Sequence, residues 1–442
     1  MLAPTLFGVG VIGFPLVYLL RANPAVVKAG AMARPECVAR CHCAFVPKIG
    51  CVVWLGTWPR DRRGGKSSHF LHHLSAGSAA WRGRRQFSET FMSIELLMLG
   101  DQPVSRLAAR TRLAEESGFE TVWLADERFY RETYSCLSYL AGQTSRVKLG
   151  PCVTDPFARH PALTAMALGT LDEISEGRAI LGIGAGVSGF AELGIQSRRP
   201  PLAIREAVDL IRQLMAGQEV DYRGEIIQFH RGRLNFTPPR ARVPVRVASN
   251  GPLGQKMGGA VADGVMMEGC GSVEEAKAFA SAVAEGATKA GRSPGEIKLV
   301  ARLDCCIAND GKQARDILRP SVTRIIAQAT SRFYTLQTQG LTLPKEVVEA
   351  IGPVPYAAGV APFAALFPLV TDRHVDALTL CGTVEEVTQH VIDLRRAGVT
   401  GFNIFPVPAP GVSYEDVIMR FGTQVWPAVK AAFAKASSEG QT

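Results

Sequence analysis

Two acidic side chains, Asp126 and Glu127, directly follow a short apolar segment at residues 121–125. Carboxylates in this position can accept a hydrogen bond from a ring N–H or a substrate hydroxyl. They can also act as a proton shuttle during a reaction. A carboxylate at this place can equally cap a helix that follows. The pair therefore indicates acid–base chemistry at the end of a strand, with helix capping as the alternative.

Two loops of small residues follow other apolar segments of the chain. The first loop consists of Gly184, Ala185 and Gly186, and the second of Ala248, Ser249, Asn250 and Gly251. Glycine lets the backbone approach a bound molecule closely, although tight turns explain most such sequences. The second loop opens a helix, where free backbone N–H groups can bind a phosphate. Lys256 lies one turn further, where it either screens that charge or is a solvated helix residue.

A basic pair, Arg159 and His160, begins the helix that follows the third apolar segment. The start of a helix favours anions through its dipole and its free N–H groups. Both side chains can therefore meet a phosphate or the substrate, but a capping or packing role fits them equally well.

Cysteine usage argues against a metal centre. Five potential ligands crowd into one short segment, namely Cys37, Cys41, His42, Cys43 and Cys51. A zinc site usually requires two separate ligand pairs with a loop between them, so we predict no bound metal. The other six cysteines are scattered, as expected of reduced thiols, and we expect the protein to be cytoplasmic.

Residues 1–91 differ in composition from the rest of the chain. They hold twelve Lys and Arg but three Asp and Glu, so they carry the whole formal net charge of +9. We predict a basic leader, disordered or upstream of the fold. Residues 2–20 are apolar, but they contain Gly and Pro, and no basic residues precede them as in a signal peptide. The balanced charge of the remainder gives no support for nucleic-acid binding or for membrane association of the body.

The remainder, residues 92–435, fits one α/β barrel better than several domains. Eight candidate strands alternate with helical segments, and the first four begin about thirty residues apart, as in consecutive βα units. They cover residues 94–99, 121–125, 147–153, 179–183, 243–248, 264–267, 297–306 and 401–405. We therefore predict a (β/α)8 TIM barrel with a hairpin near residues 220–229 and a helical insertion at 310–380. A doubly wound sheet is the alternative.

Several segments carry a family resemblance, in the order and spacing of that family: VTDPFARHPALTA, LDEISEGRAILGIGAG, SNGP, DCCIAND, and GTVEEV followed by AGVTGFNIFP. They resemble the luciferase-like oxidoreductase superfamily, and in particular its methylenetetrahydromethanopterin reductase-like branch, whose members use a deazaflavin. The resemblance covers roughly residues 92–408. It implies the barrel of the bacterial-luciferase type, with an insertion before the last strand.

The resemblance also implies site residues. A non-prolyl cis peptide is expected at Cys152–Val153, with the deazaflavin ring against it, so Cys152, Val153 and Asp155 are expected to contact the cofactor. Asp126 is expected near the pyrimidine end of that ring. Many relatives have His directly after this Asp, whereas this chain has Glu127. If that His is the acid–base group in relatives, this chain either uses Glu127 instead or carries out different chemistry, so the resemblance does not identify the substrate.

The function implied by the resemblance is hydride transfer between coenzyme F-420 and an organic small molecule. The first alternative is an FMN-dependent monooxygenase on the same fold, in which reduced flavin activates O₂, because one barrel hosts both chemistries. An inert flavin-binding barrel is an alternative of another class. We also expect a homo-oligomer, either a dimer or a tetramer.

Overall fold

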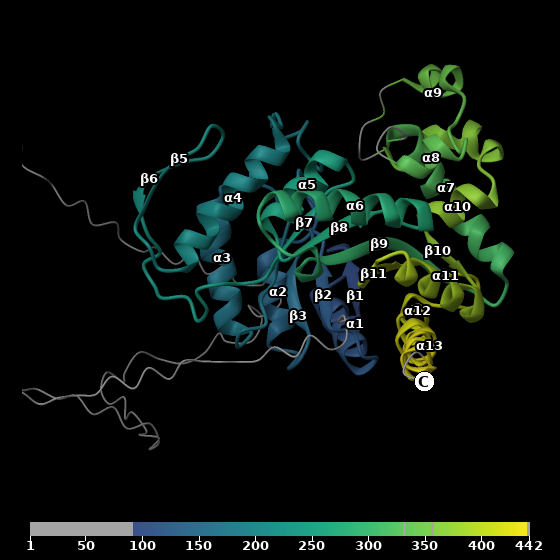
Figure 1. Ribbon diagram of the computed structural model, residues 1–442, viewed down its shortest axis with the longest axis horizontal. Coiled ribbons are helices and arrows are strands. Elements are labelled where there is room, and N and C mark those ends of the chain that lie inside the picture. Colours follow the sequence, from purple (N-terminus) through teal and green to yellow (C-terminus); the bar gives the residue numbers. More distant parts are fainter. Residues whose placement is uncertain (1–91, 330–332, 353, 355–357, 440–442) are drawn as a thin grey trace, which may run out of the picture. The chain divides into compact units, whose positions relative to one another are not determined.

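The computed structural model describes residues 92–329, 333–352, 354 and 358–439, and Figure 1 shows their arrangement. The leader predicted for residues 1–91 lies outside the described residues, and so does the cysteine cluster within it. None of the described helices is both long enough and apolar enough to cross a bilayer.

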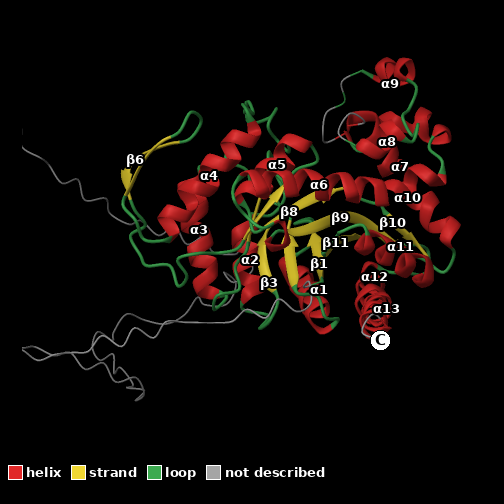
Figure 2. Cartoon of the chain, viewed as in Figure 1, coloured by secondary structure: helices red, strands yellow, loops and turns green. Residues whose placement is uncertain are grey.

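Eight parallel strands form the barrel (Figure 2). They are β1 (Ser93–Met98), β2 (Thr121–Leu124), β3 (Lys148–Pro151), β4 (Leu181–Ile183), β7 (Val245–Ala248), β8 (Gly264–Glu268), β9 (Lys298–Ile307) and β11 (Gly401–Pro406). Hydrogen-bonded neighbours run in the order β3-β2-β1-β11-β9-β8-β7-β4. Parallel bridges from Leu149 to Ala179 and from Thr154 to Ile183 join β3 to β4. Because each strand neighbours the next barrel strand along the chain, the (β/α)8 prediction is confirmed and the doubly wound sheet is wrong.

Helices surround the barrel, and two insertions extend it. The outer helices are α1 (Val104–Glu116), α2 (Thr133–Ala141), α3 (Pro161–Ile174), α4 (Pro200–Met215), α5 (Pro252–Val261), α6 (Val273–Lys289), α11 (Val384–Arg396), α12 (Tyr414–Arg420) and α13 (Trp426–Glu439). A short 3-10 turn (Pro294–Glu296) precedes β9, and a π turn (Phe421–Val425) joins α12 to α13.

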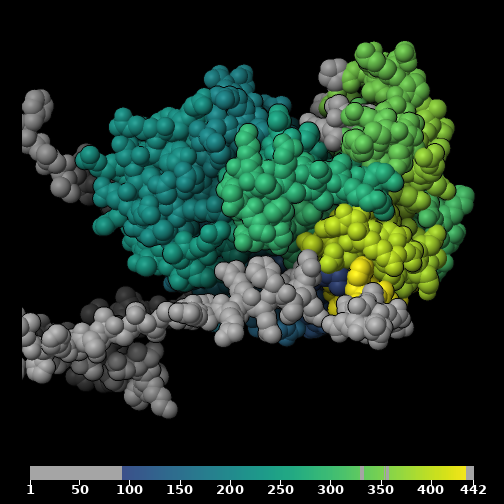
Figure 3. Space-filling model, viewed as in Figure 1, coloured from purple at the N-terminus to yellow at the C-terminus, as the bar shows by residue number. Residues whose placement is uncertain are grey.

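The first insertion is the predicted hairpin, an antiparallel pair of β5 (Val220–Arg223) and β6 (Gln228–Gly232). The second is the predicted helical stretch after β9, with α7 (Gly311–Ala329), α8 (Tyr334–Thr338), α9 (Lys345–Ile351), a 3-10 segment (Ala361–Leu369), α10 (Asp372–Leu378) and β10 (Leu380–Gly382). The hairpin lies beside α4, and α7–α10 lie beyond α6 at the other end of the domain (Figures 1 and 3).

Helix α3 buries a different face from the one that its large apolar residues suggest. The sequence places Leu163, Met166, Leu171 and Ile174 on one face of the helix, but only Leu171 is buried. The buried face also contains Thr164, Ala165 and Leu168. This helix carries apolar residues on all sides, so periodicity alone does not decide which face is buried. The face with the smaller side chains is buried because it can pack more closely on the barrel.

The buried carboxylate of Glu206, on α4, holds the tip of the hairpin. Its oxygens accept hydrogen bonds from the backbone N–H groups of Glu225 (2.8 Å), Ile226 and Ile227 (2.9 Å each). Burial alone would raise the pKa of Glu206, but the three N–H donors outweigh it and lower the pKa below its ordinary value. This carboxylate therefore stabilises the fold above its unfolded pKa, and the contribution is lost as the pH falls through the lower folded pKa.

We expect Glu206→Gln to destabilise the chain by about 1–3 kcal/mol at neutral pH, because the amide leaves buried N–H groups without an acceptor. The loss should shrink in acid, where the native carboxyl group is also protonated. Urea unfolding at several pH values measures both effects, with the exposed Glu219→Gln as control. A pH-independent difference between the Glu206 variant and the native chain would contradict this account.

Candidate active site

The mouth of the barrel has an apolar floor. A cluster of buried apolar residues lies inside the barrel, comprising Leu97, Trp123, Ala125, Ile180, Met266 and Val300. Partly buried residues pack on this cluster, namely Leu99, Cys152, Ala248 and Phe405. Each of these four lies at or just beyond the carboxyl end of its strand. Function in such barrels lies at this end, and an apolar floor suits a flat ring.

Asp126 follows β2 at this mouth, with 11% of its side chain exposed. Its Oδ1 accepts a hydrogen bond from Thr133 Oγ1 (3.2 Å) and lies 3.3 Å from Arg128 Nη1. Its Oδ2 receives no hydrogen bond within the described part of the chain. Helix α2 is capped instead by Glu132, whose carboxylate accepts from Ser135 N at 2.7 Å. The capping alternative for Asp126 is therefore wrong, and one carboxylate oxygen remains for a ligand.

Glu127 is half-buried beside Asp126. Among the described residues, no group forms a hydrogen bond or an ion pair with its carboxylate. Both acidic residues predicted from the sequence therefore follow β2 directly, with acceptor capacity left on their carboxylates.

The end of β3 has the expected backbone, and the Asp155 side chain is turned into the protein. The Cys152–Val153 peptide is cis, as the resemblance implied. Asp155 Oδ1 accepts from the backbone N–H groups of Phe157 (2.8 Å) and Ala158 (2.7 Å). Asp155 Oδ2 accepts from Arg128 Nη2. Both carboxylate oxygens thus accept from protein donors and the residue is buried, so its side chain is not open to a cofactor.

The glycine loop after β4 packs on these same groups. A Cβ on Gly184 would lie 2.7 Å from Val153 Cγ2, and one on Gly186 would lie 2.8 Å from the Asp155 carboxylate. Gly186 also has a φ of +61°, which favours glycine. Close packing against the loop after β3 is therefore enough to require glycine at both positions. The predicted contact of this loop with a cofactor stays a prediction.

The loop after β7 leaves the start of α5 open. Gly251 stands at the helix N-cap without a side-chain cap, and Pro252 follows it. Asn250 Oδ1 accepts from Glu268 N (3.0 Å), and Ser249 Oγ donates to Gly251 O (3.2 Å), so the loop is held in place. This geometry is compatible with the predicted phosphate pocket. Lys256, by contrast, pairs with Glu285 of α6 at 2.7 Å, on the solvent side.

The basic pair at the start of α3 has structural partners. His160 Nδ1 accepts from Ala162 N (3.1 Å) and caps the helix, while its Nε2 lies 2.9 Å from Gln228 O of the hairpin. Arg159 donates to Glu132 at 2.8 Å, and its guanidinium lies 4.9 Å from the centre of the Tyr134 ring. The capping alternative is confirmed for His160.

A charged group across the mouth was missed by the sequence analysis. Arg302 of β9 donates to Glu268 of β8 (2.9 Å) and to Asp304 (3.0 Å). Burial raises the pKa of Asp304 above its ordinary value, although Arg302 opposes this. The sequence could have revealed this group, because Val300, Arg302 and Asp304 are every second residue of one strand and so lie on the same face, which points into the barrel.

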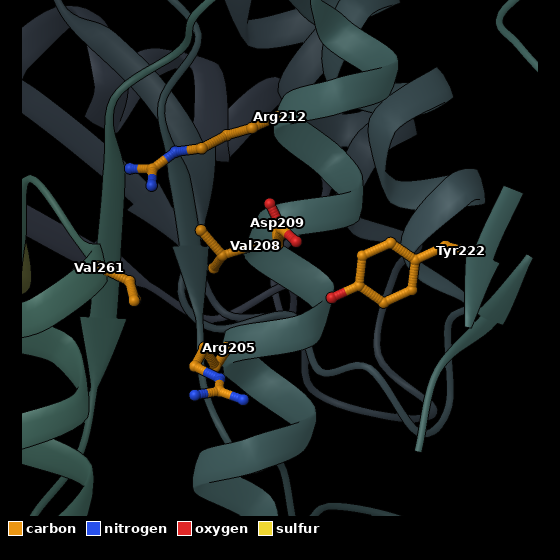
Figure 4. A pocket seen from close by; sticks show the side chains of 6 residues that line it. All are labelled: Arg205, Val208, Asp209, Arg212, Tyr222 and Val261. Atoms are coloured by element: carbon orange, nitrogen blue, oxygen red, sulfur yellow. The ribbon is translucent and has the colours of Figure 1, made fainter. Parts of the chain in front are cut away.

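Other features of the described residues do not add to this site. Burial raises the pKa of the Cys152 thiol to about 12, so it stays protonated at neutral pH. No three His, Cys, Asp or Glu side chains gather as metal ligands within the described ranges. A cavity of about 290 Å³ lies outside the barrel, lined by Arg205, Val208, Asp209, Arg212, Tyr222 and Val261 (Figure 4). Its lining comes from α4, α5 and the hairpin rather than from strand ends.

Comparison with known proteins gives the family. The model of the luciferase-like monooxygenase family matches residues 74–401, so the match begins inside the segment that we assigned to the leader. The 5,10-methylenetetrahydromethanopterin reductase of Archaeoglobus fulgidus is 33% identical over 344 residues, which are 77% of this chain and all of that protein. An F420-dependent glucose-6-phosphate dehydrogenase of Kineococcus radiotolerans is 32% identical over 47% of this chain and 65% of that protein.

Solved structures agree with the sequence relatives. The coenzyme F420-dependent tetrahydromethanopterin reductase of Methanopyrus kandleri superposes with a TM-score of 0.68 and 28% identity, over 76% of this chain and 99% of that one. A long-chain alkane monooxygenase, at 16% identity and a TM-score of 0.57, shares the fold. The chain therefore belongs to the luciferase-like monooxygenase family, as an oxidoreductase similar to the methylenetetrahydromethanopterin reductases.

Proposed function

We propose that the barrel transfers a hydride between coenzyme F-420 and an organic small molecule at its mouth. The observation that carries this proposal is the end-to-end similarity to reductases, one of which is named for coenzyme F420 and is covered over 99% of its length. A second group of relatives is also named for F420. The substrate itself stays open, since these two groups act on different molecules.

The residues at the mouth fit such a cofactor. The apolar side chains of Leu99, Cys152, Ala248 and Phe405 can receive a flat ring, and the open start of α5 can receive a phosphate. The remaining oxygen of Asp126 can accept a hydrogen bond from a ring N–H. When bound, a deazaflavin supplies a carbon that accepts or gives a hydride and reacts poorly with O₂.

The protein groups then have the following roles in the proposal. Asp126, or Glu127 beside it, holds the proton that accompanies hydride transfer. The backbone at Cys152–Asp155 and at Gly184–Gly186 bounds one side of the ring site. Ala248–Gly251 holds the phosphate end of the cofactor. Arg159 and His160 support the adjoining loops through Glu132 and Gln228.

An FMN-dependent monooxygenase is the second candidate, because the matching family model carries that description. The two candidates differ in cofactor and in reactivity with O₂. We expect coenzyme F-420 to bind at least about tenfold more tightly than FMN, since a relative that this chain matches over 99% of its length is named for F420. Equilibrium titration followed by visible absorption measures both dissociation constants. Tight FMN binding with O₂ consumption, and no detectable F-420 binding, would establish the monooxygenase instead.

We also propose that the chain forms a homo-oligomer. Four apolar side chains on α2 and α3 are about half exposed, namely Tyr139, Leu163, Met166 and Ile174. Apolar side chains gathered on adjacent helices of a soluble domain commonly mark a protein interface.

A further inference from the structure

Arg128 has an unusual set of partners at the mouth. Its Nη1 donates to the backbone oxygen of Asp126 (2.5 Å) and lies 3.3 Å from Asp126 Oδ1. Its Nη2 donates to Asp155 Oδ2. Only 15% of the side chain is exposed. One guanidinium thus joins the carboxylates that end two neighbouring strands.

The loop after β4 is attached to the same residue. The backbone N–H of Arg128 donates to Ser188 Oγ at 3.1 Å. A Cβ on Gly189 would lie 2.5 Å from Arg128 Cβ, and Gly189 has a φ of +66°, so glycine is required there. The loops that follow β2, β3 and β4 therefore meet at Arg128.

We propose that Arg128 is a positioning residue, which holds the Asp126 carboxylate so that its Oδ2 faces the bound ring and ties Asp126 to the Asp155 turn. The inference rests on the proposed function. Arginine suits this place because its planar fork can serve two carboxylates at once, whereas lysine is a point charge. Without the guanidinium, two adjacent carboxylates would repel each other and leave their present positions.

The first test is structural and does not depend on the cofactor. In a crystal structure of Arg128→Ala, we expect the hydrogen bond between Asp126 Oδ1 and Thr133 Oγ1 to be lost, with the carboxylate turned away. Soaking with guanidinium chloride should place the ion between the two carboxylates and restore the bond. An Asp126 side chain that keeps its native position in the variant without guanidinium overturns the proposal.

The second test measures F-420 affinity by fluorescence titration. Arg128→Ala should raise the dissociation constant about tenfold, since one hydrogen bond to the ring is misplaced and two carboxylates are uncompensated. Millimolar guanidinium chloride should recover most of the affinity, whereas equal concentrations of sodium chloride or urea should not. Because guanidinium weakens folded structure, recovery by this ion separates positioning from general destabilisation.

Two further variants complete the second test. Arg131→Ala, in the same loop, removes an exposed guanidinium that donates to Gly100 O, and it should leave the affinity within about twofold of native. Arg128→Lys should give an intermediate affinity. An equal loss in Arg131→Ala, or no recovery with guanidinium, overturns the proposal. Absence of F-420 binding by the native chain would instead refute the proposed function.

Discussion

Replacing Asp126 with alanine should lower turnover by about 10²- to 10⁴-fold, the usual contribution of a positioned acid–base group. The dissociation constant for coenzyme F-420 should rise by no more than about tenfold, the loss of one hydrogen bond to the ring, because the apolar floor and the Ala248–Gly251 loop are untouched. The expectation rests on geometry. Asp126 Oδ1 is held by Thr133 and Arg128, while Oδ2 receives no hydrogen bond within the described part of the chain.

The measurement is the rate at which F-420 is reduced, or F-420H₂ is oxidised, with an organic substrate that the native chain accepts. Asp126→Asn keeps the size and the contacts of the side chain but removes its charge. It should therefore lose about as much turnover as alanine if the carboxylate handles a proton. Glu127→Gln is the matched comparison. A larger loss in Glu127→Gln than in Asp126→Asn would move the acid–base role to Glu127.

Replacing Arg240 with methionine should destabilise the fold by about 3–5 kcal/mol, because it leaves a buried carboxylate without its cation. That carboxylate belongs to Asp172, near the end of α3, which is completely buried. Arg240 Nε lies 2.9 Å from Asp172 Oδ2, and Nη2 lies 2.5 Å from Oδ1. The same guanidinium donates to Ala179 O (2.8 Å), just before β4. The pair thus joins α3 to the strand that follows it.

Urea unfolding monitored by circular dichroism measures this loss. Arg242→Met is the control, since Arg242 is 63% exposed and its half-buried partner Asp263 keeps the hydrogen bonds from Arg212 and Val245 N, so the loss should be less than about 1 kcal/mol. The double variant Arg240→Met, Asp172→Leu should recover part of the loss, because both charges are removed together. If the Arg240 and Arg242 substitutions lowered the free energy of unfolding equally, the buried Asp172 carboxylate would not need its cation, and the prediction would be wrong.

The periodic patterns in the sequence were enough to predict the barrel. All eight strands lie within about two residues of their predicted bounds at the carboxyl end, and the hairpin and the helical insertion are where they were expected. This success has a local cause. A buried parallel strand must be apolar, and a helix that covers it must carry an apolar face, so both leave a pattern over a few neighbouring residues. The family segments added the Cys152–Val153 cis peptide.

The same segments also contain residues whose role the sequence did not reveal. Asp172 and Arg178 belong to LDEISEGRA, and both serve structure. Arg178 donates to the carbonyl groups of Ala141, Thr144 and Val147 and so holds the end of α2. A recognisable motif can therefore record a packing requirement rather than a catalytic one.

By itself, the sequence determined the order of the elements, the closed barrel and the place of Asp126 and Glu127 at a strand end. Only the tertiary structure decided which polar side chains remain available there. Asp155 accepts hydrogen bonds from Arg128 and from the backbone of its own turn. Lys256 forms an ion pair with Glu285, and His160 caps helix α3. Arg302 is joined to Glu268, thirty-four residues away along the chain. Strand and helix patterns are local, but a charged side chain takes its partner from whichever strand end folding brings beside it.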